Sequence, residues 1–422
     1  MRGKNFLEKL LEGVEVEWRP LGTLGELIRG NGLQKKDFTE TGVPAIHYGQ
    51  IYTYYGLSTT ETKSFVSPEL AKQLRKVDKG DVVITNTSEN LEDVGKALVY
   101  LGERQAVTGG HATVLKPGKN LLGKYFAYFT QTDAFSGEKR KHSKGTKVID
   151  VSATDMAKIS IPIPCSDSPK KSLEIQAEIV RILDSFTELT AELTAELTAR
   201  KKQYDYYRDQ LLSFKNCEAE WKTLGDIGDV KMCKRILKNE TKPEGDVPFY
   251  KIGTFGKKAD AYISRDIFED YKRRYSFPKK GDVLISASGT IGRTVIYDGE
   301  PAYFQDSNIV WLENDESVVT NKYLWHFYKI AKWAVSEGGT IDRLYNDNIK
   351  KTRIIVPYPS DPKKSLTEQA RIVAILDKFD TLTNSITEGL PREIELRQKQ
   401  YAYYRDLLFN FPKPETASAA SA

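Results

Sequence analysis

Basic side chains gather in one short stretch of the N-terminal half, at residues 138–147. The stretch reads EKRKHSKGTK and carries Lys139, Arg140, Lys141, Lys144 and Lys147 against a single acid. Lysine and arginine contact phosphate oxygens, although a basic run is more often a solvated surface. Glycines bracket the centre of the run, so we expect a loop, with phosphate contact and a solvated face as its two alternatives.

A second set of polar side chains follows a pattern that occurs twice. KGDVVIT at 79–85 and KGDVLIS at 280–286 each lead into a polar stretch and then another apolar run, which is typical of strand, loop and strand. Small hydroxyl and amide groups there could hydrogen-bond base edges, and an ordinary hairpin loop is an equal alternative. The candidates are Asn86, Ser88 and Asn90 in the first copy, and Ser286, Ser288, Thr290 and Arg293 in the second.

Two further groups of candidates lie in the second half of the chain. YKRRYSFPKKGD at 271–282 supplies Arg273 and Arg274 between tyrosines, which are more often packing residues than base stackers. EGGTIDRLYNDNIKK at 337–351 occupies the position of the basic run in the first half. It supplies Arg343, Asn346 and Lys350.

Motifs for catalysis and for metal binding are missing from the sequence. An amino-methyltransferase needs an Asn/Asp-Pro-Pro-aromatic loop and a glycine-rich loop for its methyl donor, and neither occurs. No P-loop, GxSxG or HExxH motif is present either. The cysteines at 165, 217 and 233 and the four histidines lack metal-ligand spacing. The sequence therefore predicts no catalytic residue and no metal site.

Length and composition set the scale of the protein. A chain of 422 residues suggests two or three domains at roughly 150 residues each. The 63 basic and 58 acidic residues leave a net charge of +5, which is compatible with nucleic acid without indicating it. No apolar run is long enough to cross a membrane, and the charged start lacks a signal-peptide pattern, so we expect a cytoplasmic protein.

The elements that carry these candidates belong to an internal repeat. SPKKSLEIQAEIVRILDSF at 168–186 returns as DPKKSLTEQARIVAILDKF at 361–379, and RKKQYDYYRDQLLSF at 200–214 returns as RQKQYAYYRDLLFNF at 397–411. EWRPLGTLGEL at 17–27 and EWKTLGDIGDV at 220–230 are a fainter pair. NFLEKLLEGVEVEW at 5–18 resembles the end of a helical repeat running into the next globular part. The chain is therefore organised as globular part, helix, globular part, helix, in a circular order.

The repeated segments have the apolar spacing of long helices. Their apolar positions step by three and four residues over about forty residues, roughly 60 Å of helix, as in a coiled coil. The nearest partner for each stripe is the other helix, and we expect the two to be antiparallel. Gly389 and Pro391 interrupt the second pattern, where we expect a kink or break.

A tandem four-residue unit, TAELTAEL at 190–197, lies inside the first helical segment. One added unit lengthens a helix by about 6 Å and rotates the residues beyond it by about 40°. We interpret the tandem as a spacer between the globular parts. The alternative is a low-complexity helix without a spacer role. The spacer positions are Thr190, Leu193, Thr194 and Leu197.

The repeat, the TAEL tandem and the paired segments QYDYYRDQLLSF and QYAYYRDLL resemble the specificity subunits of type I restriction–modification systems, and in particular a subgroup with TAEL repeats. The resemblance implies a subunit without catalysis that reads a bipartite DNA target. Its implied partners are double-stranded DNA, two methyltransferase subunits and restriction/motor subunits, with no membrane. S-adenosylmethionine, ATP and Mg²⁺ would belong to those partner subunits, with no cofactor on this chain.

We therefore expect an α+β fold: two mixed α/β target-recognition domains separated by two long, antiparallel, coiled-coil-like helices, pseudo-twofold and circularly arranged. The expected boundaries are an N-terminal helical segment at 1–16, target-recognition domains at 17–166 and 217–360, helical regions at 167–216 and 361–411, and a disordered tail at 412–422. Two domains held one helical turn of DNA apart would leave about six unread base pairs between half-sites. The alternatives are a coiled-coil adaptor without DNA affinity and a self-contained adenine methyltransferase.

Overall fold

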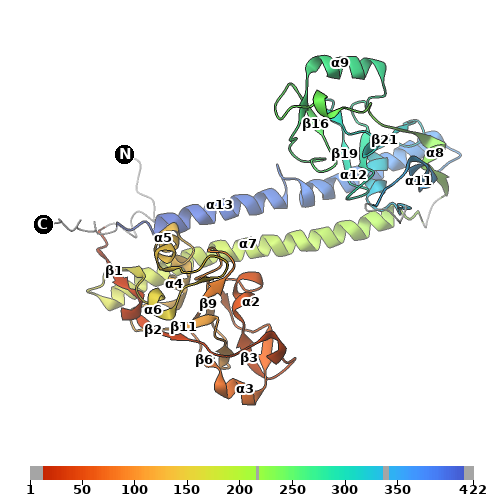
Figure 1. Ribbon diagram of the computed structural model, residues 1–422. Helices are drawn as coiled ribbons and strands as arrows, with labels where there is room; N and C mark the ends of the chain where they lie inside the picture. The colour runs from red at the N-terminus through yellow and green to blue at the C-terminus, as the bar shows by residue number, and fades with distance from the viewer. Residues whose placement is uncertain (1–12, 215–217, 336–341, 413–422) are drawn as a thin grey trace. The chain divides into compact units, whose positions relative to one another are not determined.

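The computed structural model describes residues 13–214, 218–335 and 342–412 and divides into two compact units. Unit 1 combines Met1–Leu193 with Ile394–Ala422, and unit 2 is Thr194–Glu393. Each unit therefore joins one globular domain to helical segments from both repeats. The α+β fold is confirmed (Figure 1).

Three helices form the helical repeats: α7 (Pro169–Leu211), α12 (Pro362–Asn384) and α13 (Leu390–Leu408). The first repeat is one continuous helix, whereas the second breaks between α12 and α13, as the sequence predicts. Gly389 lies in the break with φ +82°, and a Cβ there would meet the backbone oxygen of Thr381 at 2.4 Å. Glycine is the residue that such a backbone position favours. Pro391 lies in the first turn of α13, where its missing N–H is not needed.

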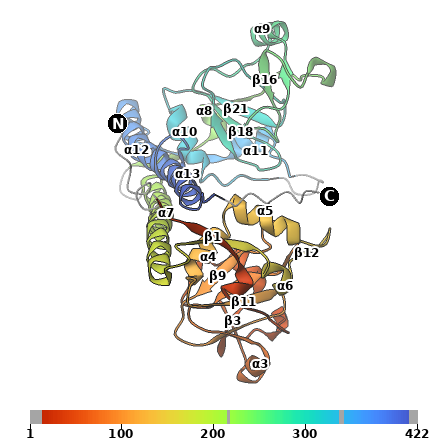
Figure 2. The ribbon, with the colours of Figure 1, turned by 90° about the vertical axis from the view of Figure 1, so that its left-hand side faces the viewer.

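Globular domain 1 is built on two sheets. The first has the order β2-β11-β7-β9-β4 and the second β5-β3-β10-β6, while β1 pairs with β13 and β8 with β12. Figures 1 and 2 show α4 near α7 and α3 at the opposite end of the domain. The elements are β1 (Val16–Pro20), β2 (Gly25–Arg29), β3 (Val43–Ile46), α2 (Tyr48–Thr53), β4 (Ser58–Thr59), β5 (Ser64–Val66), α3 (Pro68–Gln73), β6 (Arg75–Val77), β7 (Val82–Thr85), β8 (Thr87–Ser88), β9 (Ala97–Tyr100), β10 (Ala106–Thr108), β11 (Ala112–Pro117), α4 (Gly123–Phe129), α5 (Asp133–His142), β12 (Ile149–Asp150), α6 (Ala153–Met156) and β13 (Ser160–Pro164).

Globular domain 2 repeats the same plan with fewer paired strands among its described residues. Its sheets have the orders β15-β21-β18-β19 and β17-β16-β20, and β14 pairs with β22 as β1 pairs with β13. The elements are β14 (Ala219–Thr223), α8 (Leu224–Ile227), β15 (Gly228–Lys231), β16 (Val247–Tyr250), β17 (Tyr262–Ile263), α9 (Arg265–Arg274), β18 (Val283–Ser286), β19 (Thr294–Ile296), β20 (Tyr303–Phe304), β21 (Ile309–Asn314), α10 (Asn321–Tyr328), α11 (Asn346–Lys351) and β22 (Arg353–Pro357).

The apolar stripe of α7 faces two different partners along its length. Ile175 and Ile179 are buried in the core of globular domain 1, together with Leu183. Phe186 instead stacks on Tyr404 of α13, with ring centroids 5.2 Å apart. The prediction that the whole stripe meets another helix is therefore wrong for its first part. A helix that carries a globular domain must bury apolar side chains against that domain as well.

A glutamine of each helical repeat holds its globular domain through backbone atoms. The side-chain oxygen of Gln176 accepts from the N–H of Leu122 (2.9 Å), and its amide donates to the carbonyl of Asn120 (3.0 Å). Gln369 makes the same pair of contacts with the N–H of Thr320 (2.9 Å) and the carbonyl of Val318 (2.9 Å). Both glutamines are fully buried. Because the bonds go to backbone atoms, they do not depend on the side chains of the globular domain.

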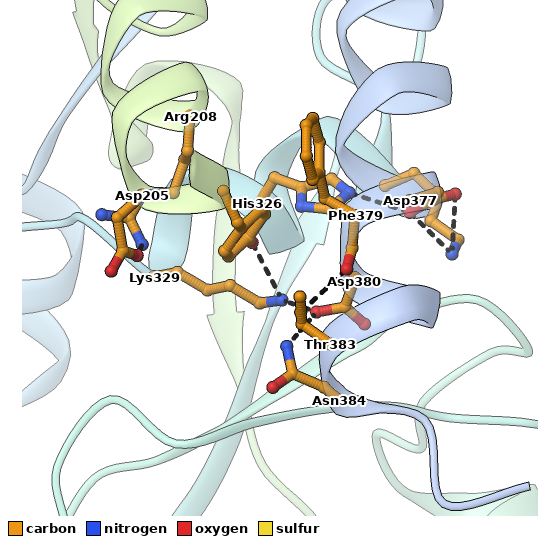
Figure 3. A network of polar contacts seen from close by, with 11 residues as sticks. Asp205, Arg208, His326, Lys329, Asp377, Phe379, Asp380, Thr383 and Asn384 are labelled. Carbon is orange, nitrogen blue, oxygen red and sulfur yellow. Dashed lines mark hydrogen bonds and ion pairs between the residues drawn. The ribbon is translucent and has the colours of Figure 1, made fainter. Parts of the chain in front are cut away.

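An aspartate further along each repeat adds a polar contact in each unit. In unit 1, Asp184 of α7 accepts from Lys124 (2.9 Å) and from the hydroxyl of Tyr128 (2.7 Å), both on α4. In unit 2, Asp377 of α12 lies 2.8 Å from Nε2 of His326 on α10 (Figure 3). Asp184 and Asp377 occupy the same position in the two repeats. Each therefore binds the corresponding helix of its globular domain, α4 in domain 1 and α10 in domain 2.

The unit 2 contact extends into a larger network around α10, in which His326 is fully buried and Lys329, Asp377 and Asp380 are half-buried (Figure 3). Burial lowers the pKa of His326 to about 4, so the ring is neutral and Nε2–H donates to the carboxylate of Asp377. Lys329 donates to Asp380 (2.6 Å) and lies 3.3 Å from the hydroxyl of Tyr204 on α7. The network therefore ties the C-terminal part of α7 and α12 to globular domain 2.

The C-terminal end of α13 completes the core of globular domain 1. Phe409 and Phe411 are buried, and the Phe409 ring lies 5.1 Å from that of Tyr125. The indole N–H of Trp18 donates to the carbonyl of Pro412 at 2.9 Å. The end of α7 packs into domain 2 in the same way, through Leu212. Of the helical segment that we predicted at 1–16, residues 1–12 lie outside the described residues, and the described residues 13–16 form no helix and lead into β1 at Val16. The tail after Pro412 also lies outside the described residues.

No helix within the described ranges is long and apolar enough to span a lipid bilayer.

Candidate nucleic-acid interface

Three segments that are distant in the sequence meet at one edge of each globular domain. In domain 1, the N–H of Asn86 donates to the carbonyl of His111 (2.9 Å), and the N–H of Val151 donates to the carbonyl of Asn86 (2.9 Å). In domain 2, the N–H of Ala287 donates to Asn308 (2.7 Å), and that of Leu344 donates to Ala287 (2.8 Å). We call this arrangement the three-segment junction: residues 86–90, 109–111 and 144–151 in domain 1, and 287–291, 306–308 and 343–345 in domain 2.

Side chains at the junction share their positions but differ in chemistry. The hydroxyl of Thr87 lies 2.8 Å from Nδ1 of His111, and at the same place the hydroxyl of Ser288 donates to Oδ1 of Asn308 at 2.7 Å. Asp150 of domain 1 corresponds to Arg343 of domain 2, which is exposed. Arg343 forms an isolated antiparallel β-bridge with Ser288, as Asp150 pairs with Thr87. One backbone frame therefore presents two different sets of donors and acceptors.

Several of the predicted loop residues have buried side chains that hydrogen-bond within the domain. Asn86 is fully buried, and its Oδ1 accepts from the hydroxyl of Thr113 at 2.7 Å. Ser286 is also buried, and its hydroxyl accepts from the N–H of Arg293 at 2.9 Å. Ser88 and Ser288 are buried as well. Asn86 and Ser286 are therefore turned into the loop and are not on its surface, and DNA contact by these two side chains stays a prediction.

Among the predicted residues of the same loops, Asn90 and Thr290 are exposed. The amide of Asn90 donates to Asp93 at 2.9 Å, and its oxygen accepts from the N–H of Asp93 at 2.8 Å. The guanidinium of Arg293 is half-buried and donates to the carbonyl of Phe255 at 3.1 Å. Asn90 and Thr290 are therefore the predicted side chains of these two loops with most access to solvent.

Lys139 corrects the prediction for the basic run. Residues 138–142 lie in α5 and not in a loop, and Lys139 is 5% exposed, with its amine donating to the carbonyl of Val94 at 2.7 Å. Burial lowers the pKa of Lys139 to about 8. Its side chain passes beside Gly95, where a Cβ would meet Cδ of Lys139 at 2.8 Å. Lys139 is thus an internal residue, and its amine does not reach a duplex.

The remaining basic residues of the run are exposed and lead to the junction. Lys141 pairs with Glu138 (3.0 Å) and Lys144 with Asp155 (2.8 Å), while Arg140 has no ion pair with the described residues. The Lys144 ammonium also holds the pKa of the Asp155 carboxyl well below its usual range. Backbone hydrogen bonds join Lys144 to β12, which in turn pairs with β8. The structure therefore brings the two candidate segments of domain 1 together.

The candidates of domain 2 are distributed differently. Arg343 lies at the junction, whereas Asn346 and Lys350 follow on α11, and Lys350 pairs with Asp229 at 2.8 Å. Residues 337–341 of this stretch lie outside the described part of the chain. The exposed Arg273 and Arg274 at the end of α9 both pair with Asp270, at 3.0 and 2.8 Å. No hydrogen bond or ion pair among the described residues joins these two arginines to the junction.

Sequence reasoning missed the segment that precedes β11 and β21. His111 and Asn308 complete the junction there, and Arg29 reaches the same place, with Nε donating to the carbonyl of Gly110 at 3.0 Å and Nη2 lying 3.3 Å from Asp150. Tyr48 adds a ring 4.8 Å from that of His111. The Gly109-Gly110 pair was the available signal, since paired glycines mark a tight turn that exposes the next side chain.

No group of three or more His, Cys, Asp or Glu side chains in the described ranges is arranged to hold a metal ion. The carboxylates and histidines of the junction instead hydrogen-bond to neighbouring side chains. The arrangement is suited to presenting hydrogen-bonding groups on a surface.

Comparison with known proteins agrees with this arrangement. The family model for the type I restriction modification DNA specificity domain matches residues 13–200 and again 218–396. The specificity subunit of the type I restriction enzyme EcoR124I/EcoR124II from Escherichia coli is 38% identical over 436 residues, covering 99% of this chain and 100% of that protein. A Haemophilus influenzae chain assigned as a type I restriction enzyme specificity subunit is 48% identical over 421 residues, covering 97% and 99%.

Solved structures show the same fold at low sequence identity. The type I restriction–modification S subunit of M. genitalium has a TM-score of 0.56 at 16% identity, covering 95% of this chain and 98% of that one. A chain from a structure of type I R-M complex assembly and conformational transition has a TM-score of 0.59 at 16% identity, covering 93% and 97%. With two copies of the family domain along its length, the chain belongs to the non-catalytic DNA specificity subunits of type I restriction–modification systems.

Proposed function

We propose that each globular domain reads one half of a bipartite DNA target through its three-segment junction. The observation that carries this proposal is one backbone frame with different polar side chains at its accessible positions: His111 and Asp150 in domain 1, and Asn308 and Arg343 in domain 2. Base edges are distinguished by the placement of donors and acceptors in the major groove. Two such sets on one frame would select two different half-sites.

Exposed basic residues around the junction would position the duplex through its phosphates. In domain 1 these are Arg140, Lys141 and Lys144, and in domain 2 Arg343. Further candidates outside the domain 2 junction are Asn346 and the half-buried Lys350 on α11 and the exposed Arg273 and Arg274 on α9. Phosphate contacts fix register and affinity without reading sequence. They would also make binding steeply dependent on salt, unlike that of an adaptor without DNA affinity.

The TAEL tandem would set the distance between the half-sites. All four spacer positions, from Thr190 to Leu197, lie within α7, and the boundary between the two compact units falls inside the tandem, between Leu193 and Thr194. Half-sites one helical turn apart, about 10 base pairs centre to centre, would leave about six base pairs unread.

The helical repeats would carry the partners that perform chemistry. Two methyltransferase subunits would dock on the two repeats, and restriction/motor subunits would add to that complex, bringing S-adenosylmethionine, ATP and Mg²⁺. The near identity of the repeats beside diverged globular domains supports one partner that binds twice.

Mapping methylated adenines in cells that carry this chain and its methyltransferase subunit tests the proposal. We expect two half-sites with a constant unread gap. His111→Ala should relax the first half-site alone and Asn308→Ala the second alone, because one lost base contact is worth about 1–3 kcal/mol of discrimination. Glu69→Ala, an exposed change on α3, should leave the map unchanged. A single contiguous target, or a change of both half-sites by one substitution, would contradict the proposal.

A further inference from the structure

The two helical repeats share an exposed face that neither unit uses for its own packing. Lys202, Tyr206 and Asp209 lie at i, i+4 and i+7 on α7, which places them on one side of the helix. Lys399, Tyr403 and Asp406 stand at the same positions on α13. All six are exposed, and the two tyrosines are 61% and 64% exposed. We call each set of three the Lys-Tyr-Asp face.

The neighbouring tyrosine of each repeat stacks on a phenylalanine within its own unit, although Tyr207 is still 41% exposed. Tyr207 stacks on Phe379 with centroids 5.7 Å apart, and Tyr404 stacks on Phe186 at 5.2 Å. Tyr206 and Tyr403 point away from these stacks and touch only the edges of Tyr207 and Tyr404 among the rings of the described residues. Packing within the units therefore explains the second tyrosine of each pair and leaves the first without a structural role.

The two copies have changed at other exposed positions of the same segment. Lys201 corresponds to Gln398, Asp205 to Ala402 and Gln210 to Leu407. The first of each of these pairs is exposed on α7. The segment has therefore accepted substitutions on its surface, while the Lys-Tyr-Asp face is the same in both copies. An aromatic ring that stays exposed in both copies, while exposed neighbours have changed, is what a surface that binds the same partner twice requires.

We propose that each Lys-Tyr-Asp face docks one methyltransferase subunit, with the phenol ring of Tyr206 or Tyr403 seated in an apolar pocket of that partner. This inference rests on the proposed function, which supplies the partner. Two identical faces, one in each compact unit, fit two copies of one protein. Tyrosine is among the residues that dominate binding energy at protein interfaces, because it buries a large rigid surface and loses little side-chain entropy.

The charged members of the face favour a pocket with a polar rim. Asp209 and Asp406 pair with the adjacent arginines, Arg208 at 2.9 Å and Arg405 at 2.7 Å, so their charges are already partly neutralised. Rim charges of this kind steer association more than they add affinity. The aromatic ring would therefore supply most of the binding energy, and the lysine and aspartate would fix the orientation.

Native mass spectrometry of the full chain with purified methyltransferase subunit tests the inference. The wild-type chain should bind two copies, Tyr206→Ala and Tyr403→Ala one tight copy each, and the double variant none at concentrations that saturate the wild type. Each lost site should weaken by about 30-fold or more in Kd, as for a central interface tyrosine. Tyr206→Phe should keep its copy, because the ring and not the hydroxyl fills the pocket.

Tyr54→Ala is the matched control, since Tyr54 is 59% exposed in globular domain 1 and belongs to neither face. Unchanged helicity and melting temperature of the double variant would show that it is folded. Two copies bound to the folded double variant with unchanged Kd would overturn the inference, and loss of binding in Tyr206→Phe would overturn the apolar pocket. A wild-type chain that binds no methyltransferase subunit would contradict the proposed function instead.

Discussion

Lys139 shows how far residue type alone can mislead about a site. It stands in the middle of a basic run, yet the helix that carries the run turns this one side chain inward, onto the carbonyl of Val94. A lysine that is buried with one hydrogen bond is costly when charged, which is why burial lowers its pKa to about 8. The neighbours Arg140 and Lys141 are exposed on the same helix, so residue type alone does not separate them from Lys139.

Lys139→Met should change how the stability of unit 1 depends on pH. The folded pKa of about 8 lies below the unfolded value of 10.5, so between these values the unfolded state binds more protons. Stability due to this site therefore rises with pH across that window, by at most about 1.4 kcal/mol per pH unit. Urea unfolding at pH 7 to 10 should show a shallower rise in the variant.

Lys141→Met is the control for this measurement, because the Lys141 side chain is 69% exposed and should leave the slope unchanged. An equal rise in wild type and Lys139→Met would show that the Lys139 amine is not buried in solution.

At the scale of elements, the helical repeats hold two different globular domains with the same atoms. Gln176 and Gln369 bind backbone groups, so the loop before α4 and the loop before α10 can differ in sequence and still dock. The aspartates further along the repeats contact side chains, which differ between the domains. Asp184 accepts from a tyrosine hydroxyl, and Asp377 accepts from a histidine ring. The contacts that are the same in both domains are therefore those of the glutamine.

Gln176→Ala should loosen the attachment of globular domain 1 locally. The substitution leaves the N–H of Leu122 and the carbonyl of Asn120 without their partner in a half-buried site, at no more than about 1–3 kcal/mol for each. Amide hydrogen exchange at Leu122 should become about 10-fold faster or more, while exchange at Thr320 in domain 2 stays the same. Gln210→Ala, at an exposed position of α7, is the matched control. Unchanged protection of Leu122 would contradict the role assigned to the glutamine.

The sequence predicts the helices of this protein better than it predicts the three-segment junction of each globular domain. The repeat and the apolar period predict α7, and Gly389 with Pro391 predicts the break before α13, because both signals are local. The three-segment junction depends on hydrogen bonds among residues near 86, 111 and 151, and no local pattern encodes that pairing. For the same reason the sequence could name Asn86 as polar but could not show that its side chain turns inward.

At the scale of the whole molecule, each compact unit takes helical segments from both repeats. The two places where the chain passes from one unit to the other lie in α7 at Leu193 and in α13 at Glu393. The first lies inside the TAEL tandem, so a change of length there alters the connection without touching either core.

Inserting one further TAEL unit after Leu197 should widen the gap between the half-sites and leave both half-sites unchanged. Four helical residues add about 6 Å, or one to two base pairs at about 3.4 Å each. The measurement is the methylation map of the variant complex. Thr190→Ala with Thr194→Ala keeps the helix length and should keep the gap. An unchanged gap after the insertion would show that the tandem is not the spacer.

The packing of Phe409 and Phe411 in the core of globular domain 1 also bears on the order in which the protein is made. Unit 2 is a single continuous segment and can close as soon as it leaves the ribosome. Unit 1 contains the residues synthesised first, yet its core waits for the last helix, about 200 residues later. At about 5–20 residues per second this is a delay of roughly 10–40 s. Globular domain 1, which is translated before unit 2, therefore completes its core only after unit 2 has been made.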